Sequence, residues 1–306
     1  MKVLVNGASG YIGRAVVRGL LDAGHEVLGG ARGEVAAKTL RARGLETVYA
    51  DLNDTQSLIS ATSNVDAVIE TASADHSAST TAFLSTLRGS GRTYIRTSGS
   101  AIYSDLSKGQ PSNVLHTEDD GYPPVALLAS RFDSDAETIA AAEDGVRSII
   151  IRPSMIYGYG ASEQLPSLLR AALRHGVSGY TGPGLNRYGN VFVEDLGQVY
   201  ALALEKASAG SVYNIAADEM DLKSIAESIG RLVDVPARSF TDDVEAERIL
   251  GNSVWVSALG SNSRVDSSKA RNELGWDPIG PDLLSDIEFG SYRLWRTQPP
   301  TVRAAA

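Results

Sequence analysis

Short apolar runs alternate with amphipathic stretches through the first half of the chain. The apolar runs predict strands at residues 2–6, 26–31, 46–50, 66–72, 92–98 and 147–152. Between them, apolar residues with helical spacing predict helices at 11–23, 33–43, 54–62, 78–90 and 129–143. Strands separated by helices of this length are typical of a parallel sheet with helices on both faces. We therefore predict an α/β fold built on a doubly wound parallel sheet.

The pattern changes past residue 155. Helices are predicted at 162–174, 195–206, 222–232 and 283–294, and short strands at 190–194 and 211–215. This second pattern indicates a smaller substrate lobe at 156–298, some of whose segments return to the domain formed by 1–155. Residues 299–306 are expected to form a flexible tail.

Composition and net charge limit the classes of molecule that the chain is expected to bind. The chain has 306 residues, a formal net charge of -9 and no cysteine. An acidic chain argues against nucleic acid and anionic membrane surfaces, which select clustered Lys and Arg. The absence of cysteine excludes disulfides and thiolate metal sites. With neither a signal peptide nor a long apolar span in the sequence, we expect a cytoplasmic protein that binds a small molecule.

A glycine-rich loop joins the first strand to the first helix. Gly7 permits a tight turn, Gly10 allows close approach of a phosphate, and Gly13 lets the helix pack on the sheet. Backbone N–H groups at such a helix start suit a pyrophosphate. This arrangement predicts a Rossmann dinucleotide site. The whole loop is assigned to cofactor binding, including the intervening residues Ser9, Tyr11 and Ile12.

The second strand ends at Ala31 and Arg32, where NAD-binding proteins place an acidic residue for the ribose 2′-hydroxyl. A guanidinium at this position suits a 2′-phosphate instead, so the sequence favours NADP(H) over NAD. Arg32 equally fits a solvated residue at a helix start. Asp51 and Leu52 close the third strand and are predicted to border the adenine.

Taken together, these motifs resemble the extended short-chain dehydrogenases/reductases, within the NAD-dependent epimerase/dehydratase family. Further segments carry the resemblance, namely 66–73, 152–158, 191–195 and 268–278. The resemblance implies that Thr71, Ala72 and Pro153 line the cofactor. It also implies that Asn186 and Tyr188 meet the substrate, although a loop of this composition equally fits a surface turn.

The catalytic helix departs from the family. Relatives carry a Tyr-x-x-x-Lys pair, in which the tyrosine transfers a proton and the lysine lowers the tyrosine pKa and holds the nicotinamide ribose. The alignment places Leu127 at the tyrosine and Arg131 at the lysine, and no lysine occurs between Lys108 and Lys206. Arg131 can still bind ribose hydroxyls. Leu127 cannot transfer a proton, so another residue or water must do so, or the chemistry must differ.

The end of the fifth strand resembles the family's serine-rich segment. Counting back from Tyr103 places Gly99 where relatives have a catalytic hydroxyl, with Ser98 and Ser100 on either side. One of these serines is expected to present its hydroxyl to a substrate oxygen. The alternative is that both satisfy backbone groups at a strand end.

Several residues could replace the missing acid. Tyr103, Tyr122 and Tyr157 carry phenols, and His116 lies in the segment expected to border the pocket. We assign Tyr103 to catalysis and His116 and Tyr157 to substrate binding. Each of these tyrosines equally fits a half-buried core residue. No grouping has the spacing of metal ligands, so no metal site is predicted.

Three functions remain open at this point. The first is an NADP(H)-dependent oxidoreductase acting on a small carbonyl, imine or alcohol. The second is a redox-neutral epimerase, dehydratase or cyclase on the same fold, and the third is a non-catalytic NADP(H) sensor. The resemblance also implies a homodimer formed through the helices near 78–90 and 129–143.

Overall fold

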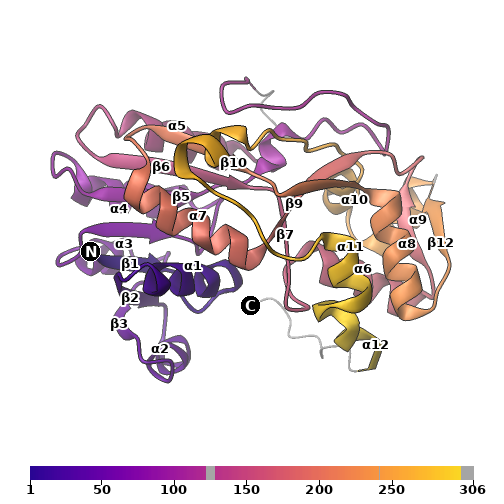
Figure 1. Cartoon of the computed structure of the whole chain (residues 1–306), viewed down its shortest axis with the longest axis horizontal. Helices are drawn as coiled ribbons and strands as arrows, with labels where there is room; N and C mark the ends of the chain where they lie inside the picture. The colour runs from indigo at the N-terminus through magenta and orange to yellow at the C-terminus, as the bar shows by residue number, and fades with distance from the viewer. Residues whose placement is uncertain (122–127, 241, 298–306) are drawn as a thin grey trace.

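A computed structural model describes residues 1–121, 128–240 and 242–297. Its main feature is a parallel sheet with the strand order β10-β6-β5-β4-β1-β2-β3 (Figure 1). The strands are β1 (Lys2–Asn6), β2 (Glu26–Ala31), β3 (Glu46–Tyr49), β4 (Ala67–Glu70), β5 (Thr93–Thr97), β6 (Arg147–Pro153) and β10 (Ser211–Ile215). Val3, Leu4 and Val5 of β1 are fully buried, as expected for a strand covered on both faces. The order reverses between β1 and β4, which opens a crevice at their carboxyl ends.

Helices cover both faces of this sheet. One face carries α1 (Tyr11–Asp22), α2 (Glu34–Arg41) and α7 (Val193–Lys206), and the other carries α3 (Thr55–Ala61), α4 (Ser77–Leu87) and α5 (Ala129–Ala140). The helices α1 and α7 pack closely because Gly19 and Gly197 lie at their contact. A Cβ atom on Gly19 would lie 2.7 Å from the carbonyl oxygen of Gly197. The doubly wound α/β fold predicted from the sequence is confirmed.

A second group of elements builds a separate core beside the carboxyl edge of the sheet. It contains a three-stranded sheet of β7 (Met155–Tyr157), β9 (Arg187–Phe192) and β11 (Asp218–Asp221), and a pair formed by β8 (Ser178–Thr181) and β12 (Ala237–Phe240). Its helices are α6 (Gln164–His175), α8 (Leu222–Val233), α9 (Asp243–Leu250), α10 (Ser253–Leu259), α11 (Leu283–Phe289) and α12 (Leu294–Thr297). Although α7 and β10 also come from the second half of the chain, β10 belongs to the seven-stranded sheet and α7 to a helix layer on that sheet.

Secondary structure differs from the expectation mainly in this second half. The strands β7, β8, β11 and β12 and the helices α9 and α10 were not predicted, because segments of three to eight residues are too short to show a clear period. The strand predicted at 190–194 is β9, which ends at Phe192, where α7 begins. The helix predicted at 283–294 stops at Phe289, because Gly290 leaves the helical region with φ -102° and ψ -133°.

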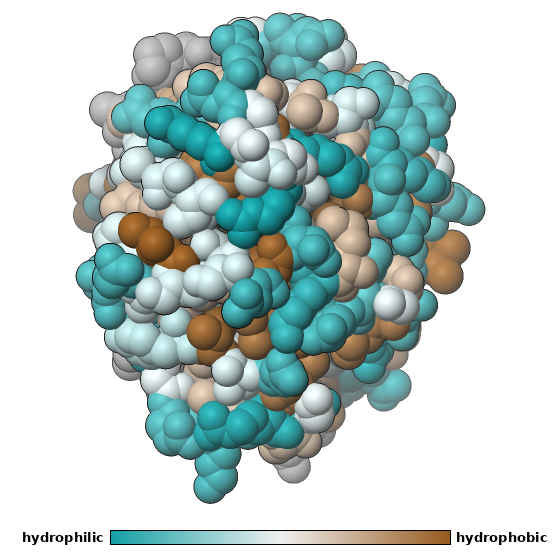
Figure 2. Space-filling view, turned by 90° about the vertical axis from the view of Figure 1, so that its left-hand side faces the viewer, coloured by the Kyte–Doolittle hydropathy of each residue, from teal (hydrophilic) through white to brown (hydrophobic). Residues whose placement is uncertain are grey.

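The surface mixes polar and apolar residues. On the face shown in Figure 2, at the sheet end of the molecule, hydrophobic residues form small groups between hydrophilic ones. Among the described residues, the helices are all too short or too polar to span a bilayer. A cleft between the sheet and the second lobe is the candidate functional site.

Candidate functional site

The glycine-rich loop has the shape that a phosphate group needs. Gly7 has φ +85°, and a Cβ atom there would lie 2.8 Å from the backbone nitrogen of Ala72. A Cβ atom on Gly13 would lie 2.1 Å from the carbonyl oxygen of Gly7, so α1 meets the loop only because residue 13 lacks a side chain. Gly10 caps α1 without a side-chain hydrogen bond, which leaves N–H groups of its first turn available to an anion.

The loop opens into a cleft of about 800 Å³ between the sheet and the second lobe. Most of the residues predicted from the sequence line it: Gly7, Ser9, Gly10, Tyr11, Ile12, Arg32, Asp51, Leu52, Thr71, Ala72, Ser98, Ser100, Arg131, Pro153 and Tyr188. The volume and shape suit a dinucleotide with a small substrate. The bare glycine loop, the helix N-terminus and the cleft together fit a nicotinamide dinucleotide.

Arg32 follows β2 at the rim of the cleft. Its side chain is exposed, and no ion-pair partner occurs for it among the described residues. Asp51 lines the same end of the cleft and accepts a hydrogen bond from the backbone N–H of Asn53 at 2.9 Å. The guanidinium of Arg32 is therefore free to meet a negative group at this rim.

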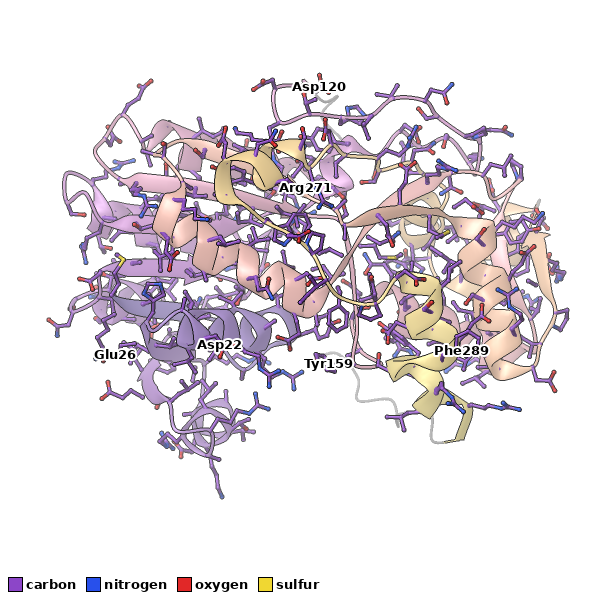
Figure 3. The ribbon with its side chains drawn as sticks, viewed as in Figure 1. Asp22, Glu26, Asp120, Tyr159, Arg271 and Phe289 are labelled. Atoms are coloured by element: carbon purple, nitrogen blue, oxygen red, sulfur yellow. The ribbon has the colours of Figure 1, made fainter. Side chains whose placement is uncertain are left out.

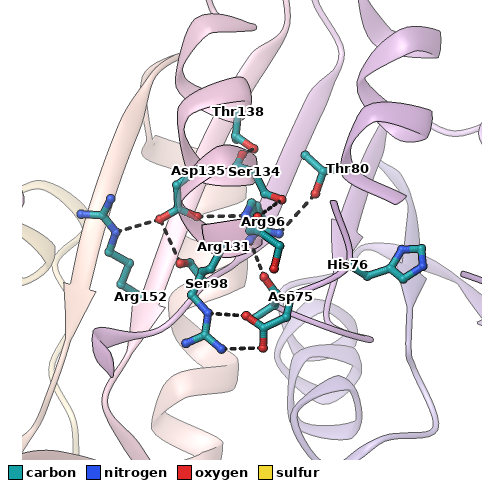
Figure 4. Close-up of polar contacts among 12 residues, drawn as sticks. Asp75, His76, Thr80, Arg96, Ser98, Arg131, Ser134, Asp135, Thr138 and Arg152 are labelled. Atoms are coloured by element: carbon teal, nitrogen blue, oxygen red, sulfur yellow. Dashed lines mark hydrogen bonds and ion pairs between the residues drawn. The ribbon is translucent and has the colours of Figure 1, made fainter. Parts of the chain in front are cut away.

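A buried charged cluster lies directly behind Ser98 (Figure 4). Asp135 of α5 accepts hydrogen bonds from Arg96 of β5 at 2.9 Å, Arg152 of β6 at 3.2 Å and the Ser98 hydroxyl at 2.9 Å. All three charged side chains are at most 2% exposed. Since the Ser98 proton is directed to Asp135, the Ser98 oxygen can only accept a hydrogen bond from a ligand in this arrangement.

The proton of Ser100 is also directed to the protein. Ser263 donates to the backbone carbonyl of Ser100 at 2.8 Å, and the two hydroxyl oxygens lie 2.8 Å apart. Because Ser263 has one proton and uses it on that carbonyl, the Ser100 hydroxyl is the donor between the two side chains. Both serines flanking Gly99 thus offer acceptors, and not protons, to the cleft.

Arg131 forms a two-point ion pair with Asp75 across the cleft wall (Figure 4). Its Nε and Nη2 donate to Oδ1 and Oδ2 of Asp75, each at 2.8 Å. Asp75 lies in the loop after β4, and the backbone of the preceding Ala74 accepts from Arg96 at 2.6 Å. The two arginines therefore tie this loop to α5 and to the cluster around Asp135. Asp75, Asp135 and Arg96 were not among the predicted site residues.

Four predicted site residues have partners away from the cleft and are absent from its lining. Tyr103 stacks on His116, with ring centres 4.7 Å apart, and its hydroxyl accepts from Arg152 at 2.9 Å and donates to the carbonyl of Thr117 at 3.1 Å. Burial raises the pKa of Tyr103 above its ordinary value. Tyr157 donates to the carbonyl of Pro281 at 2.5 Å.

Asn186 is the fourth of these residues. Its side-chain nitrogen donates to the carbonyls of Leu259 and Ser261 at 2.8 and 2.7 Å. Gly13 also lies outside the lining, in keeping with its packing role. Tyr122 and Leu127 fall outside the described residues. The functional assignments of Asn186, Tyr103, His116 and Tyr157 stay predictions.

A buried carboxyl group, that of Glu70, forms hydrogen bonds with residues that border the glycine loop. Glu70 at the end of β4 is fully buried, accepts from the side-chain nitrogen of Asn6 at 3.0 Å and accepts from the backbone N–H of Ala72 at 2.8 Å. Burial raises the pKa of Glu70 to about 7, against the lowering effect of these hydrogen bonds and of Arg96. An acidic residue after the apolar run 67–69 was the sequence signal that could have singled it out.

Tyr11 links the glycine loop to the second lobe. Its hydroxyl donates to the carbonyl of Gly158 at 3.0 Å. Residues 158–160 all have positive φ, at 126°, 56° and 65°, and Tyr292 and Trp295 anchor this turn through hydrogen bonds to its backbone. Figure 3 shows Tyr159 between α1, on the side away from Asp22, and the C-terminal helices. Ser162, Glu163 and Gln164, which follow this turn, line the cleft.

Relatives match most of the length of the chain in sequence. It is 33% identical over 306 residues to an uncharacterised protein of Schizosaccharomyces pombe, covering 95% of this chain and 100% of the relative. It is 27% identical to the 2-alkyl-3-oxoalkanoate reductase of Stenotrophomonas maltophilia, covering 72% of this chain and 71% of the reductase.

The solved structures show the same fold. The dTDP-glucose 4,6-dehydratase of Streptomyces venezuelae with NAD bound superposes with a TM-score of 0.75 at 21% identity, covering 97% of each chain. The model of the NAD dependent epimerase/dehydratase family matches residues 3–216. This range contains the glycine loop, the cluster around Asp135 and the turn at Gly158. The chain therefore belongs to the NAD dependent epimerase/dehydratase family.

Proposed function

We propose that the protein is an NADP(H)-dependent oxidoreductase that acts on a small carbonyl, imine or alcohol. The observation that carries the proposal is the glycine-loop cleft with the unpaired guanidinium of Arg32 at its adenosine end. The loop and the start of α1 would hold the pyrophosphate, and Arg32 would hold the 2′-phosphate. When bound, the cofactor supplies or removes a hydride equivalent. In carbonyl reduction, the substrate carbon gains the hydride and the oxygen gains a proton.

The charges around the second lobe favour a substrate without phosphate groups. Arg187 and Arg264 flank the cleft residues Tyr188 and Ser263, and both pair with Glu219 at 2.7 Å. Residues 122–127 contain no Lys or Arg. Nucleotide-linked substrates, such as the one named for the dTDP-glucose dehydratase, need cations to neutralise a diphosphate. Of the described residues that line the substrate side of the cleft, Arg131 carries a positive charge, and its guanidinium is already paired with Asp75.

The relatives support carbonyl chemistry in a family that contains both reductases and redox-neutral enzymes. The name of the Stenotrophomonas protein describes reduction of a 3-oxo group. A ketone of this kind fits a cleft lined on the substrate side by Met155, Ile156 and several hydroxyl groups. We therefore propose a ketone, aldehyde or imine without phosphate groups as substrate, in preference to a sugar nucleotide.

The test is NADPH consumption, followed at 340 nm, with panels of ketones, 3-oxo acids and esters, aldehydes and imines. Turnover of at least one phosphate-free carbonyl compound or imine is expected, and UDP- and dTDP-glucose are expected to be inert. Tight NADPH binding with no oxidation across all panels would overturn the proposal. NADH serves as the matched cofactor control and is expected to react with a higher KM.

A redox-neutral reaction is the second candidate, because the protons of both serines that flank Gly99 are directed to the protein. An epimerase or dehydratase would convert its substrate without net change in NADPH. Incubation of the protein with stoichiometric cofactor and each panel compound, followed by mass spectrometry and NMR, separates the candidates. Product formation with no change at 340 nm supports the redox-neutral enzyme.

A further inference from the structure

By the resemblance noted in the sequence, Gly99 aligns with the catalytic hydroxyl of the family, and its backbone does not explain why it is glycine. Its φ of 179° is extended, a conformation that every residue adopts. The reason lies in the space around it. A Cβ atom on Gly99 would lie 3.2 Å from Nη1 of Arg131 and 3.7 Å from the carbonyl oxygen of Pro153. The guanidinium of Arg131 thus lies next to residue 99, where a side chain on that residue would contact it.

The ion pair with Asp75 leaves one end of that guanidinium available. Asp75 accepts from Nε and Nη2, which form one edge of the planar group. Nη1 forms no hydrogen bond with any of the described residues and lies over Gly99, in the lining of the cleft. Arg131 is 13% exposed and Asp75 is 51% exposed, so the guanidinium is partly desolvated while its partner borders water. Asp75 holds the orientation in which Nη1 lies over Gly99.

We propose that Arg131 contacts the substrate oxygen directly through Nη1 and stabilises the negative charge that develops there, with Asp75 as its positioning residue. This inference rests on the proposed oxidoreductase function. It assigns to Arg131 a role beyond holding the nicotinamide ribose. The protons of Ser98 and Ser100 are directed to Asp135 and Ser263, and among the other described residues Nη1 of Arg131 is the side-chain donor within 4 Å of a Cβ atom on Gly99.

The chemistry of arginine defines what this group does. A guanidinium stays protonated at all accessible pH values, so Arg131 supplies hydrogen bonds and charge and keeps its proton. In carbonyl reduction, the π electron pair moves to the oxygen as the carbon gains a hydride, and the resulting alkoxide lies against Nη1. Water in the cleft then protonates the alkoxide and leaves hydroxide. A separate proton-donating tyrosine is not required in this scheme.

A binding experiment tests the inference without turnover. Acetate, butyrate and benzoate carry a fixed negative oxygen and serve as probes, titrated calorimetrically into the full-length protein with and without NADP+. Loss of a charge-assisted hydrogen bond in Arg131→Ala is expected to weaken probe binding by about 10- to 100-fold. NADP+ affinity is expected to change by less than about threefold, since the loop and Arg32 provide most of the cofactor contacts. Arg248→Ala, on the exposed surface of α9, is the matched control.

The outcomes separate this inference from the proposed function. Equal probe affinity in Arg131→Ala and the unmodified protein overturns the inference, as does absence of probe binding to both. Loss of NADP+ affinity with unchanged probe affinity also overturns it, because Arg131 would then be only a cofactor residue. A protein that does not bind NADP+ contradicts the proposed function, while the probe titrations without cofactor still decide the role of Arg131.

Kinetics on the first active substrate extend the test. At saturating NADPH, kcat of Arg131→Ala is expected to fall by about 100- to 1000-fold, the usual loss for one oxyanion donor. Added guanidinium ion is expected to restore part of this kcat. Asp75→Asn is expected to lower kcat more than it raises KM, with an unchanged melting temperature. A change in KM for NADPH alone in either variant would overturn the assignment.

Discussion

The hydroxyl of Ser98 donates to the fully buried carboxylate of Asp135 at 2.9 Å, directly behind the cleft. Asp135 is also the shared acceptor for Arg96 and Arg152, which come from neighbouring strands. Burial of an ion is expensive unless its hydrogen bonds are satisfied. Here one carboxylate joins β5, β6 and α5 at the point where the cofactor cleft begins, so its charge is required for the geometry of Ser98.

Removal of that carboxylate is expected to destabilise the fold strongly. Asp135→Ala removes the carboxylate that two buried guanidinium groups share, which predicts a loss of about 3–5 kcal/mol in the free energy of unfolding. Urea denaturation followed by circular dichroism measures it. Asp144→Asn, in an exposed pair with Arg88, is the control and should change stability by less than about 0.5 kcal/mol. Similar losses in the two variants would contradict the role of Asp135.

We predict that cofactor preference depends on Arg32. Arg32→Ala removes the cation at the rim of the cleft, and NADPH affinity is expected to fall by about 10- to 100-fold, as for loss of a charged hydrogen bond. NADH lacks the 2′-phosphate, so its affinity should change by less than about twofold. Fluorescence titration of both cofactors measures the difference. Arg41→Ala, whose guanidinium pairs with Glu34 on α2, controls for net charge. An equal effect on both cofactors would refute the assignment.

Gly13 is predicted to be intolerant of any side chain. In Gly13→Ala the new Cβ atom would lie 2.1 Å from the carbonyl oxygen of Gly7, so α1 and the loop must separate. We expect a stability loss of about 1–3 kcal/mol, typical of overpacking, and loss of measurable NADPH binding. Gly121→Ala, where no atom of the described residues lies within 4 Å of the added atom, should match the unmodified protein. Thermal melts and NADPH titrations of the two variants provide the comparison.

The glycine loop could be predicted because its parts are neighbours in sequence. A strand, three glycines and a helix lie within residues 2–22, and their spacing carries the physical requirement directly. The cluster behind Ser98 has no such local signal. Asp135 contacts Arg96 and Arg152 at separations of 39 and 17 residues, and only the order of the parallel strands brings them together.

The pair of Arg131 and Asp75, 56 residues apart, depends equally on topology. The sequence aligns Arg131 with the lysine that is missing here. That Arg131 lies over Gly99 could not be predicted from the sequence, because the contact depends on how α5 packs beside the end of β5. The same limit applies to Tyr103 and His116. Their residue types suit catalysis, yet the fold stacks them together beside Arg152 and outside the cleft lining.

Stability is expected to depend on pH through Glu70. Its pKa is raised by burial from an ordinary value of 4.5 to about 7. Between these values the folded protein holds a proton that the unfolded chain has released, so a rise in pH favours unfolding. The contribution is most favourable below about pH 4.5, declines as the pH rises to about 7 and is constant above that pH. The groups facing Glu70 are Asn6, the N–H groups of Ala72 and Ser73, and Arg96.

Glu70→Gln removes this titration while keeping the size of the side chain. The difference in unfolding free energy between the variant and the unmodified protein should shift in favour of the variant from pH 5 to pH 7 and then stay level to pH 8.5. Other ionisable groups titrate in both proteins and cancel in this difference. Urea denaturation at half-unit pH steps measures it. A difference that is independent of pH across this range would show that Glu70 stays ionised in the fold, with Asn6 and Ala72 sufficient to hold its charge.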